Sequence, residues 1–298
     1  MKKSNLWIIT FGECSRLDRL REECDKKQMG LKVIKSYNVH VTNSKIFHND
    51  KEIKFQKGDV IWSISNNIVG HHLIQYIYQR FQDELNFIWP DINAINFADK
   101  FWTGNFFSKN NIVTPKTVFI NTFKVEKIEK LKNYVGGYPC VIKSCAGSMG
   151  ENVEIVRTNE EVKVFIDKNM TRKVDVPFRR KAFLLQEFIK ESSGTDFRVL
   201  CLDGEVLGVI KRTAQNGDFK ANVSLGGKAE IIKLNDEMKK MAEKIMKKGN
   251  IFYAGIDFIK SDRGYLALEI NTSAQFKGFE AATGTNVAEK IIKELMKK

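Results

Sequence analysis

A predicted β-hairpin over residues 255–271 constrains the fold of this chain more than any other stretch. Two runs of apolar, β-branched and aromatic residues flank the turn-forming segment 261–264 (sequence SDRG), which is the pattern of two antiparallel strands. The glycine of this segment suits the left-handed position that closes a three-residue loop. With Arg263 at the tip of that loop, the hairpin pairs Asp257 with Glu269.

One face of the hairpin is predicted to carry oxygen atoms, and the other is predicted to join the core. Side chains alternate between the two faces of a strand, so Asn271 shares the face of Asp257 and Glu269. The opposite face carries Ile256, Phe258, Leu268 and Ile270. Carboxylate and amide oxygens are ligands that Mg²⁺ prefers, and facing like charges are destabilising without a partner. Two solvated acids on an outer sheet face are the alternative, which stays open at this point.

Size and composition are those of an ordinary globular protein. The 298 residues, 43% of them hydrophobic and 29% charged, can form a sizeable core divided among two or three subdomains. No apolar run approaches the ~20 residues that a membrane-spanning helix needs, so no membrane association is expected. The five cysteines form no CxxC pair and have no histidine at zinc spacing, which predicts reduced thiols in a cytoplasmic protein.

The formal net charge of +13 at pH 7 allows two interpretations. A basic surface attracts nucleic acid, anionic nucleotides or an acidic protein. The excess is, however, mostly lysine scattered along a chain that is also rich in Asn and Ile, as an A/T-rich coding bias would produce. Because the sequence lacks a recognition helix, a zinc module and aromatic RNA-binding signatures, a nucleic-acid partner is not favoured.

The order of predicted strands and helices divides the chain into three parts. Strands alternate with helices over residues 1–97, which predicts an open α/β unit with a parallel sheet. This unit lacks a GxGxxG after its first strand, so dinucleotide binding has no support. A helix over residues 99–109 begins a central α+β part, residues 98–185, and a second α+β part occupies residues 186–298.

A loop of small residues follows a predicted strand that ends in Lys143. The strand, residues 138–143, leads into residues 144–150 (SCAGSMG), and a second strand follows at 153–156. Backbone N–H groups of such a loop can close over phosphate oxygens while the lysine supplies charge. The segment is not a P-loop, because it has no Gly-Lys-Ser/Thr and no helix follows directly. A plain glycine hairpin explains the loop equally well when it is taken alone.

A second hairpin is predicted over residues 195–211, with residues 203–204 (DG) as its two-residue turn. Counting outward from this turn pairs Asp196 with Lys211 and places Arg198 on the same face. A cross-strand ion pair on a wet surface explains this cluster as well as a ligand site does. Such pairs contribute only ~0.2–1 kcal/mol.

Taken together, these segments resemble the ATP-grasp ligases, most closely the RimK-type branch, which adds glutamates to a ribosomal protein. The resemblance covers nearly the whole chain and rests on short motifs in a fixed order and spacing. The motifs are Asp99-Lys100, residues 139–143 before the loop 147–150, 186–191 (QEFIKE), 194–198 (GTDFR), 217–222 (GDFKAN) before 226–227 (GG), 255–257 (GID), 268–271 (LEIN) and 278–284 (GFEAATG).

The resemblance implies an ATP-grasp fold, in which an N-terminal α/β (pre-ATP-grasp) domain precedes two α+β subdomains that sandwich ATP. The implied nucleotide contacts are Lys100, Lys143, Gly147, Ser148, Gly150, Gln186, Glu187, Phe188, Ile189, Asp196, Lys211 and Lys220. The implied ligands of one or two Mg²⁺ ions, which Mn²⁺ could replace, are Asp257, Glu269 and Asn271. The residues implied to act on the triphosphate and the acyl group are Arg212, Lys143 and Asn222.

The implied activity is the ATP-dependent ligation of a carboxylate to an amine. The carboxylate of a peptide, a protein tail or an amino acid attacks the γ-phosphate, and an amine then displaces phosphate from the acyl-phosphate. Mg²⁺, Lys143 and Arg212 would neutralise the repelling charges and align the reactants. No covalent enzyme intermediate is required, in keeping with the lack of a Ser/His/Asp or Cys/His set. Ring closure within a peptide would use the same residues, and the branch often forms homo-oligomers.

Two positions depart from the family pattern. Ser-Pro-Gly usually follows the metal-binding asparagine, whereas Asn271 is followed by residues 272–275 (TSAQ), so that Ala274-Gln275 replaces Pro-Gly. An arginine is usual before the double glycine, where this chain has Leu225. The loss of Pro-Gly alters a loop near the acceptor, and Leu225 removes one anion contact. A nucleotide-binding regulator that no longer transfers acyl groups is therefore the alternative hypothesis.

Overall fold

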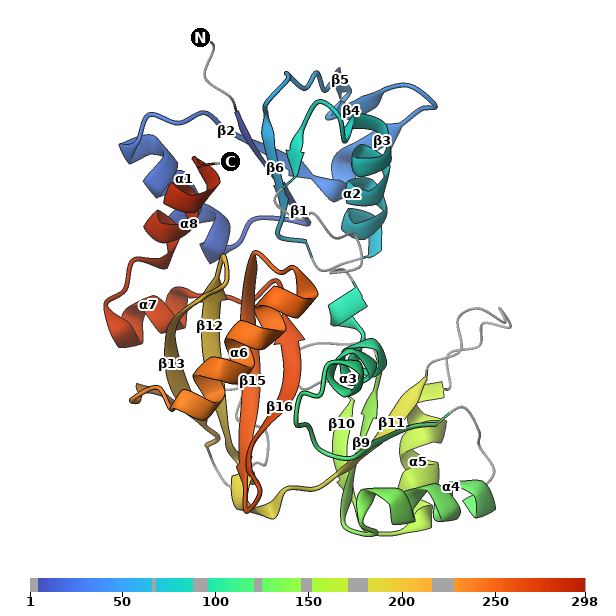
Figure 1. Cartoon of the computed structure of the whole chain (residues 1–298). Helices are drawn as coiled ribbons and strands as arrows, with labels where there is room; N and C mark the ends of the chain where they lie inside the picture. Colours follow the sequence, from blue (N-terminus) through green and yellow to red (C-terminus); the bar gives the residue numbers. More distant parts are fainter. Residues whose placement is uncertain are drawn as a thin grey trace.

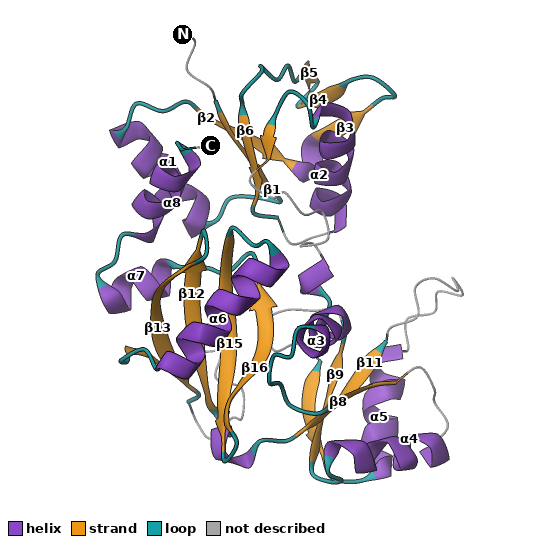
Figure 2. Cartoon of the chain, viewed as in Figure 1, coloured by secondary structure: helices purple, strands orange, loops and turns teal. Residues whose placement is uncertain are grey.

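The computed structural model describes residues 5–65, 68–87, 96–120, 125–145, 152–170, 182–215 and 228–297. Over these residues the chain forms three main sheets, each with helices packed against it (Figures 1 and 2). The N-terminal sheet lies above the C-terminal sheet in Figure 1, and the central sheet lies beside the C-terminal sheet at the lower right.

The N-terminal part is the open parallel α/β unit that the sequence predicts. Its sheet has the strand order β2-β1-β6-β7, and every pairing in it is parallel. A small antiparallel sheet, β3-β4-β5, is inserted after β2. The elements are β1 (Leu6–Thr10), α1 (Ser15–Lys26), β2 (Leu31–Lys35), β3 (Val39–Val41), β4 (Ile46–His48), β5 (Lys51–Glu52), β6 (Val60–Ser63), α2 (Ile68–Phe81) and β7 (Asn86–Phe87).

The central part is an antiparallel sheet with the strand order β10-β9-β11-β8. It has a hydrophobic core of its own, to which α4 and α5 contribute Ile128 and Phe165. Strand β11 runs through Glu187, two residues past the boundary at 185 that the sequence suggests. The elements are α3 (Lys100–Lys109), β8 (Thr117–Ile120), α4 (Val125–Lys132), β9 (Cys140–Ser144), β10 (Val153–Val156), α5 (Asn159–Met170) and β11 (Phe183–Glu187).

The C-terminal part is built on a five-stranded antiparallel sheet with the order β14-β13-β12-β15-β16. Helix α6 lies across one face of this sheet (Figure 1) and buries Met238 and Ile245. The elements are β12 (Thr195–Leu202), β13 (Glu205–Thr213), β14 (Lys228–Ile231), α6 (Asp236–Gly249), β15 (Tyr253–Ser261), β16 (Gly264–Asn271), α7 (Lys277–Thr283) and α8 (Val287–Leu295).

The hairpin β15–β16 has the predicted pairing of Asp257 with Glu269, but it reaches that pairing by another route. Ser261 pairs with Gly264, so the turn has two residues, and a bulge between Asp257 and Phe258 restores the expected register. The extra residue of this bulge is Leu268. The prediction that Leu268 joins the core is therefore wrong: its side chain is only half-buried, because a bulge turns one residue out of the alternation.

The hairpin β12–β13 differs from its prediction in the same way, with a larger consequence. A bulge at Leu207 shifts the register between Leu200 and Cys201, so Asp196 pairs with Arg212. Because a slip of one residue moves each following side chain to the other face, the predicted pairing of Asp196 with Lys211 is wrong. Lys211 instead pairs with Phe197 on the opposite face of the sheet.

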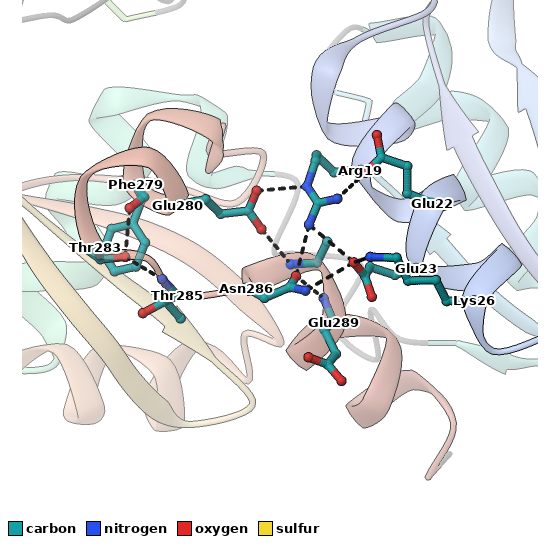
Figure 3. A network of polar contacts seen from close by, with 11 residues as sticks. Arg19, Glu22, Glu23, Lys26, Phe279, Glu280, Thr283, Thr285, Asn286 and Glu289 are labelled. Carbon is teal, nitrogen blue, oxygen red and sulfur yellow. Dashed lines mark hydrogen bonds and ion pairs between the residues drawn. The ribbon is translucent and has the colours of Figure 1, made fainter.

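The N-terminal and C-terminal parts share hydrophobic cores and are joined by a polar network. Helices α1 and α8 lie side by side (Figure 1), with Leu20 and Ile291 fully buried in one cluster. Arg19 also donates to Glu280 at 3.0 Å and to Asn286 at 3.1 Å, which links α1 to α7 and to the start of α8 (Figure 3). Among the described helices, none is both long and apolar enough to cross a lipid bilayer.

Candidate active site

Asp257 is held by Arg198, which lies directly opposite it on the neighbouring strand. The register of β12 and β15 pairs the two residues, so the arginine side chain reaches the carboxylate across the sheet face. Nε of Arg198 donates to Oδ1 of Asp257 at 2.7 Å, and Nη2 donates to Oδ2 at 2.6 Å. This two-point contact fixes the orientation of a carboxylate that is only 2% exposed.

Arg212 links the same carboxylate to Asp196. Its Nε and Nη2 donate to the two oxygens of Asp196 at 2.5 and 2.6 Å, and Nη2 also donates to Oδ2 of Asp257 at 2.9 Å. Arg198, Arg212, Asp196 and Asp257 thus form one buried unit, which we call the Arg–Asp cluster. It contains two positive and two negative side chains and is therefore neutral.

The two acids of the Arg–Asp cluster differ in protonation equilibrium. Burial acts to raise the pKa of Asp257, but the two nearby guanidinium groups outweigh it and lower this pKa to about 2. For Asp196, burial is the largest influence and raises the pKa to about 6, with the charge of Asp257 adding to the rise and Arg212 opposing it. Asp257 is therefore a permanent anion at neutral pH.

Glu269 and Asn271 complete the predicted oxygen face. Glu269 lies opposite Asp257 and is half-buried, and among the described residues no hydrogen bond or ion pair engages its carboxylate. The Asn271 Oδ1 atom accepts from the Ser273 backbone N–H at 3.1 Å. No group of three His, Cys, Asp or Glu residues in the described chain is placed to hold a metal ion. Two carboxylates and an amide nevertheless form a hard-oxygen set that fits Mg²⁺.

Lys143 approaches this face from the central sheet. It is 6% exposed, and its Nζ donates to Oε1 of Gln186 at 2.8 Å, while Nε2 of Gln186 donates to Thr117. Burial, and after it the charge of Lys100, lower the pKa of Lys143 to about 8, and the charge of Glu269 opposes this shift. The lysine of β9 and the glutamate of β16 are thus within electrostatic reach of each other, although they belong to different sheets.

Lys100 is brought beside Lys143 by the first turn of α3. The Asp99 side chain accepts from the backbone N–H groups of Phe101 and Trp102 and caps this helix. The Lys100 backbone N–H donates to the Cys145 carbonyl at 2.9 Å, which ties the helix to the end of β9. Two lysines predicted to contact phosphate therefore lie together.

The linker after β11 is connected to the tip of the β15–β16 hairpin. Oε2 of Glu187 accepts from the Lys116 backbone N–H at 3.1 Å and from Nη2 of Arg263 at 2.7 Å. Phe188 is half-buried and Ile189 is buried in this linker. The contact with Arg263 has no signal in the sequence, because it joins a turn to a segment 76 residues away.

Several predicted site residues lie apart from this arrangement. Lys211 faces away from the Arg–Asp cluster, and its Nζ lies 3.2 Å from Oε1 of Glu230 on β14. Its predicted place beside Asp196 is taken by Arg212. Outside the described residues are Gly147, Ser148, Gly150, Lys220, Asn222 and Leu225.

The segment that departs from the family pattern is tied to the N-terminal part by Arg16. This arginine is 4% exposed; Nη1 donates to the carbonyls of Ser273 and Ala274, and Nη2 donates to the Ile64 carbonyl at 2.8 Å. The Ala274 carbonyl also accepts from the Tyr253 hydroxyl at 2.9 Å. No sequence pattern predicts this role of Arg16, because its partners are backbone atoms.

Comparison with known proteins assigns the family. A profile described as "RimK-like ATP-grasp domain" matches residues 97–295, about two thirds of the chain. The chain belongs to the RimK-like ATP-grasp family. A relative named "Probable alpha-L-glutamate ligase", from Shewanella pealeana, is 36% identical over 215 residues, which are 70% of this chain and 45% of the relative. The chain thus spans about half the length of that relative.

Solved structures confirm the ATP-grasp fold that the resemblance implies. The ATP-grasp ligase PsnB in complex with a minimal precursor has a TM-score of 0.71, with 17% identity and 99% coverage of both chains. A RimK domain protein from Sphaerobacter thermophilus has a TM-score of 0.73, with 14% identity, 97% coverage of this chain and 98% of that chain. At these identities the likeness concerns the fold alone.

Proposed function

We propose that this RimK-like ATP-grasp protein is an ATP- and Mg²⁺-dependent ligase that joins a carboxylate to an amine through an acyl-phosphate. The observation that carries the proposal is the approach of Lys143, on the central sheet, to Glu269, which pairs with Asp257 of the Arg–Asp cluster on the C-terminal sheet. A nucleoside triphosphate requires cationic side chains for its phosphates and acidic side chains for its metal, and here the two kinds face each other from two sheets.

In this proposal the chain binds the nucleotide between the two sheets. Lys100 and Lys143 contact phosphate oxygens, and the backbone of the linker at Glu187 and Phe188 offers hydrogen bonds to the base, with Gln186 and Ile189 beside it. Asp257, Glu269 and Asn271 would hold Mg²⁺. The bound ion would neutralise negative charge on the phosphates. Asp196 serves mainly to hold Arg212.

The remaining residues act on the reacting groups. Arg212, with Asn222, faces the triphosphate and the acyl group, where its planar guanidinium can bind two oxygens at once. Lys143 adds charge where a carboxylate must approach a polyanion, so the residues act through alignment and charge neutralisation. The amine then attacks the carbon of the acyl-phosphate. The bond from this carbon to the bridging oxygen breaks, and phosphate leaves with that oxygen.

We propose a peptide or protein tail as the carboxylate substrate and an amino acid, such as glutamate, as the amine. The name of the Shewanella pealeana relative supports glutamate, and the PsnB complex is with a precursor. Ring closure within a peptide uses the same groups and is the second candidate. The five free cysteines accord with a reducing compartment, so we place the protein in the cytoplasm.

A screen of phosphate release tests this function. Purified protein is incubated with ATP, Mg²⁺ and pairs of acidic peptides and amino acids, and products are identified by mass. The proposal expects ADP and an amide product in equal amounts for at least one pair, including a dehydrated cyclic product if the ring closes. Tight ATP binding with no amide product from any pair would favour the regulator instead.

A further inference from the structure

Most of the acceptor capacity of Asp257 is already in use. A carboxylate offers about four lone-pair directions, and three of them accept hydrogen bonds here. Oδ1 accepts from Arg198, and Oδ2 accepts from both Arg198 and Arg212. Two donors meet at Oδ2, so a divalent cation that binds Asp257 through this atom must compete with a guanidinium group.

The two arginines are anchored to Asp257 in different ways. Arg198 lies directly opposite Asp257 and makes two bonds to it, at 2.7 and 2.6 Å. Arg212 lies one strand further away, makes two bonds to Asp196, and reaches Asp257 through the single, longer bond of 2.9 Å. The contact of Arg212 with Asp257 is therefore the one that can be exchanged, whereas Arg198 positions the carboxylate.

The net charge of the site becomes more negative if Arg212 leaves it. With both arginines in place, the Arg–Asp cluster is neutral, and Glu269 alone presents negative charge to a cation. With Arg212 drawn away, Asp196, Asp257 and Glu269 outnumber Arg198 by two negative charges. A divalent cation carries two positive charges and would neutralise this net charge.

We propose that Arg212 is a placeholder cation, which occupies Asp257 in the nucleotide-free protein and moves to the nucleotide phosphates when Mg²⁺ binds. The part of this inference that concerns nucleotide binding rests on the proposed function, whereas the part that concerns cation binding does not. Phosphate oxygens attract the guanidinium in two-point contacts as strongly as carboxylates do. Metal and nucleotide then bind cooperatively, and linkage requires each to strengthen the other by the same factor.

Cation affinity without nucleotide is the sharpest test. Free Mn²⁺ is measured by electron paramagnetic resonance during titration of the wild type, Arg212→Met and Arg212→Lys. Arg212→Met should bind Mn²⁺ about tenfold or more tightly than the wild type, because one positive charge beside Asp257 is gone. Arg212→Lys keeps that charge and should stay near the wild-type affinity. Adding Asp257→Asn to Arg212→Met should abolish the gain.

A control variant separates this effect from a general change in charge. Lys228→Met removes one positive charge from β14 in the same sheet, where Lys228 pairs with Thr213 on the face opposite Arg212 and is exposed. Its Mn²⁺ affinity should equal that of the wild type. Arg212→Met removes both arginine hydrogen bonds of Asp196 and one of the three that Asp257 accepts. It should therefore melt at a lower temperature than the wild type, and Mn²⁺ should raise its melting temperature more than it raises that of the wild type.

The outcomes distinguish this inference from the proposed function. Equal or weaker Mn²⁺ binding by Arg212→Met, with no added thermal stabilisation by Mn²⁺, overturns the placeholder role even if the wild type ligates substrates. A gain in Mn²⁺ affinity in a protein that binds no ATP would support the cation exchange and overturn the ligase. Equal gains in Arg212→Met and Lys228→Met would also contradict the inference.

Discussion

At the scale of single residues, the candidate site is a balance between buried charges on two sheets. Among the described residues, Lys143 has a neutral amide as its only hydrogen-bond partner, and Glu269 has none. The two charges act on each other electrostatically, and neither is bound in an ion pair with a described residue. Asp257, by contrast, is engaged by two arginines, so substitutions of these residues should have separable effects.

Glu269→Gln should remove ADP formation and leave the fold intact. The substitution deletes a carboxylate that no described residue binds, so the melting temperature should stay near that of the wild type, whereas turnover should fall by about 10² or more. Steady-state ADP release, with thermal melting in parallel, measures both quantities. Glu230→Gln, an exposed acid on β14 in the same sheet, is the matched control. Full turnover by Glu269→Gln would remove the case for a metal at this face.

ATP affinity should weaken above pH 8 because of Lys143. Burial lowers the pKa of this lysine to about 8, so it is charged below that pH and becomes neutral above it. A polyanion binds the charged form, so binding takes up a proton at high pH. The dissociation constant should rise about tenfold between pH 7 and pH 9, as the competent fraction falls.

Isothermal titration calorimetry in two buffers of different ionisation enthalpy measures this affinity and the proton uptake together. Lys143→Arg is the control, because a guanidinium stays charged over the whole range and should abolish the pH dependence. A wild-type affinity that does not change between pH 7 and pH 9 would contradict a phosphate contact by Lys143.

At the scale of elements, two β-bulges decide which side chains reach the site. Without a bulge at Leu207, Lys211 would face Asp196, and Arg212 would lie on the other side of the sheet. The residue after the bulge is Gly208, with φ of +154°, and a Cβ built there would lie 3.0 Å from Cζ of Phe279 on α7. A side chain at this position would therefore press against Phe279.

Gly208→Ala should lower the free energy of unfolding by about 1–3 kcal/mol, through backbone strain and overlap with a buried ring. Urea denaturation followed by circular dichroism measures the loss. Gly104→Ala is the matched control, because that glycine lies inside α3 with nothing within 4 Å of the added carbon. The control should be unchanged or more stable, since Ala is the better helix former. Equal stability of the two variants would show that the bulge tolerates a side chain.

The elements themselves were largely predictable, and the registers only in part. The apolar run of residues 6–10 predicted β1 with its observed bounds, and the helix predicted over residues 99–109 is observed over Lys100–Lys109, with Asp99 as its cap. Counting from a turn works until a bulge inserts a residue. Asp257 and Glu269 met as expected because the bulge offset the shorter turn, whereas Asp196 met Arg212 because of an uncompensated bulge. A bulge is set by tertiary packing, which local sequence does not reveal.

At the scale of the whole molecule, the N-terminal and C-terminal parts form a continuous body, and the central sheet has a separate core. The joint between α1 and α7–α8 is partly polar: Arg19 and Glu23 of α1 contact Glu280 and Asn286 (Figure 3). Contacts between residues more than 250 positions apart have no local signature, so the sequence could not predict them.

Arg19→Met should lower the free energy of unfolding by about 1–3 kcal/mol, because Glu280 and Glu23 lose a charged partner at a largely buried joint. Chemical denaturation measures the loss, and a double-mutant cycle with Glu280→Gln should show coupling of about 0.5 kcal/mol or more. Arg21→Met is the control: this half-buried arginine of α1 forms its ion pairs, among the described residues, with the exposed acids Glu13 and Asp18, and its loss should cost less than about 0.5 kcal/mol. Equal losses at both positions would mean that the network does not join the two parts.

The most direct test of the whole account is to locate the metal. Crystals grown with Mn²⁺ and a non-hydrolysable ATP analogue give an anomalous difference map that shows manganese alone. The account predicts a peak bound by Glu269, Asn271 and Asp257, with Lys143 on the phosphates and Arg212 no longer bonded to Asp257. A nucleotide held elsewhere, or a bound metal that leaves Glu269 without a ligand and the Arg–Asp cluster intact, would contradict it.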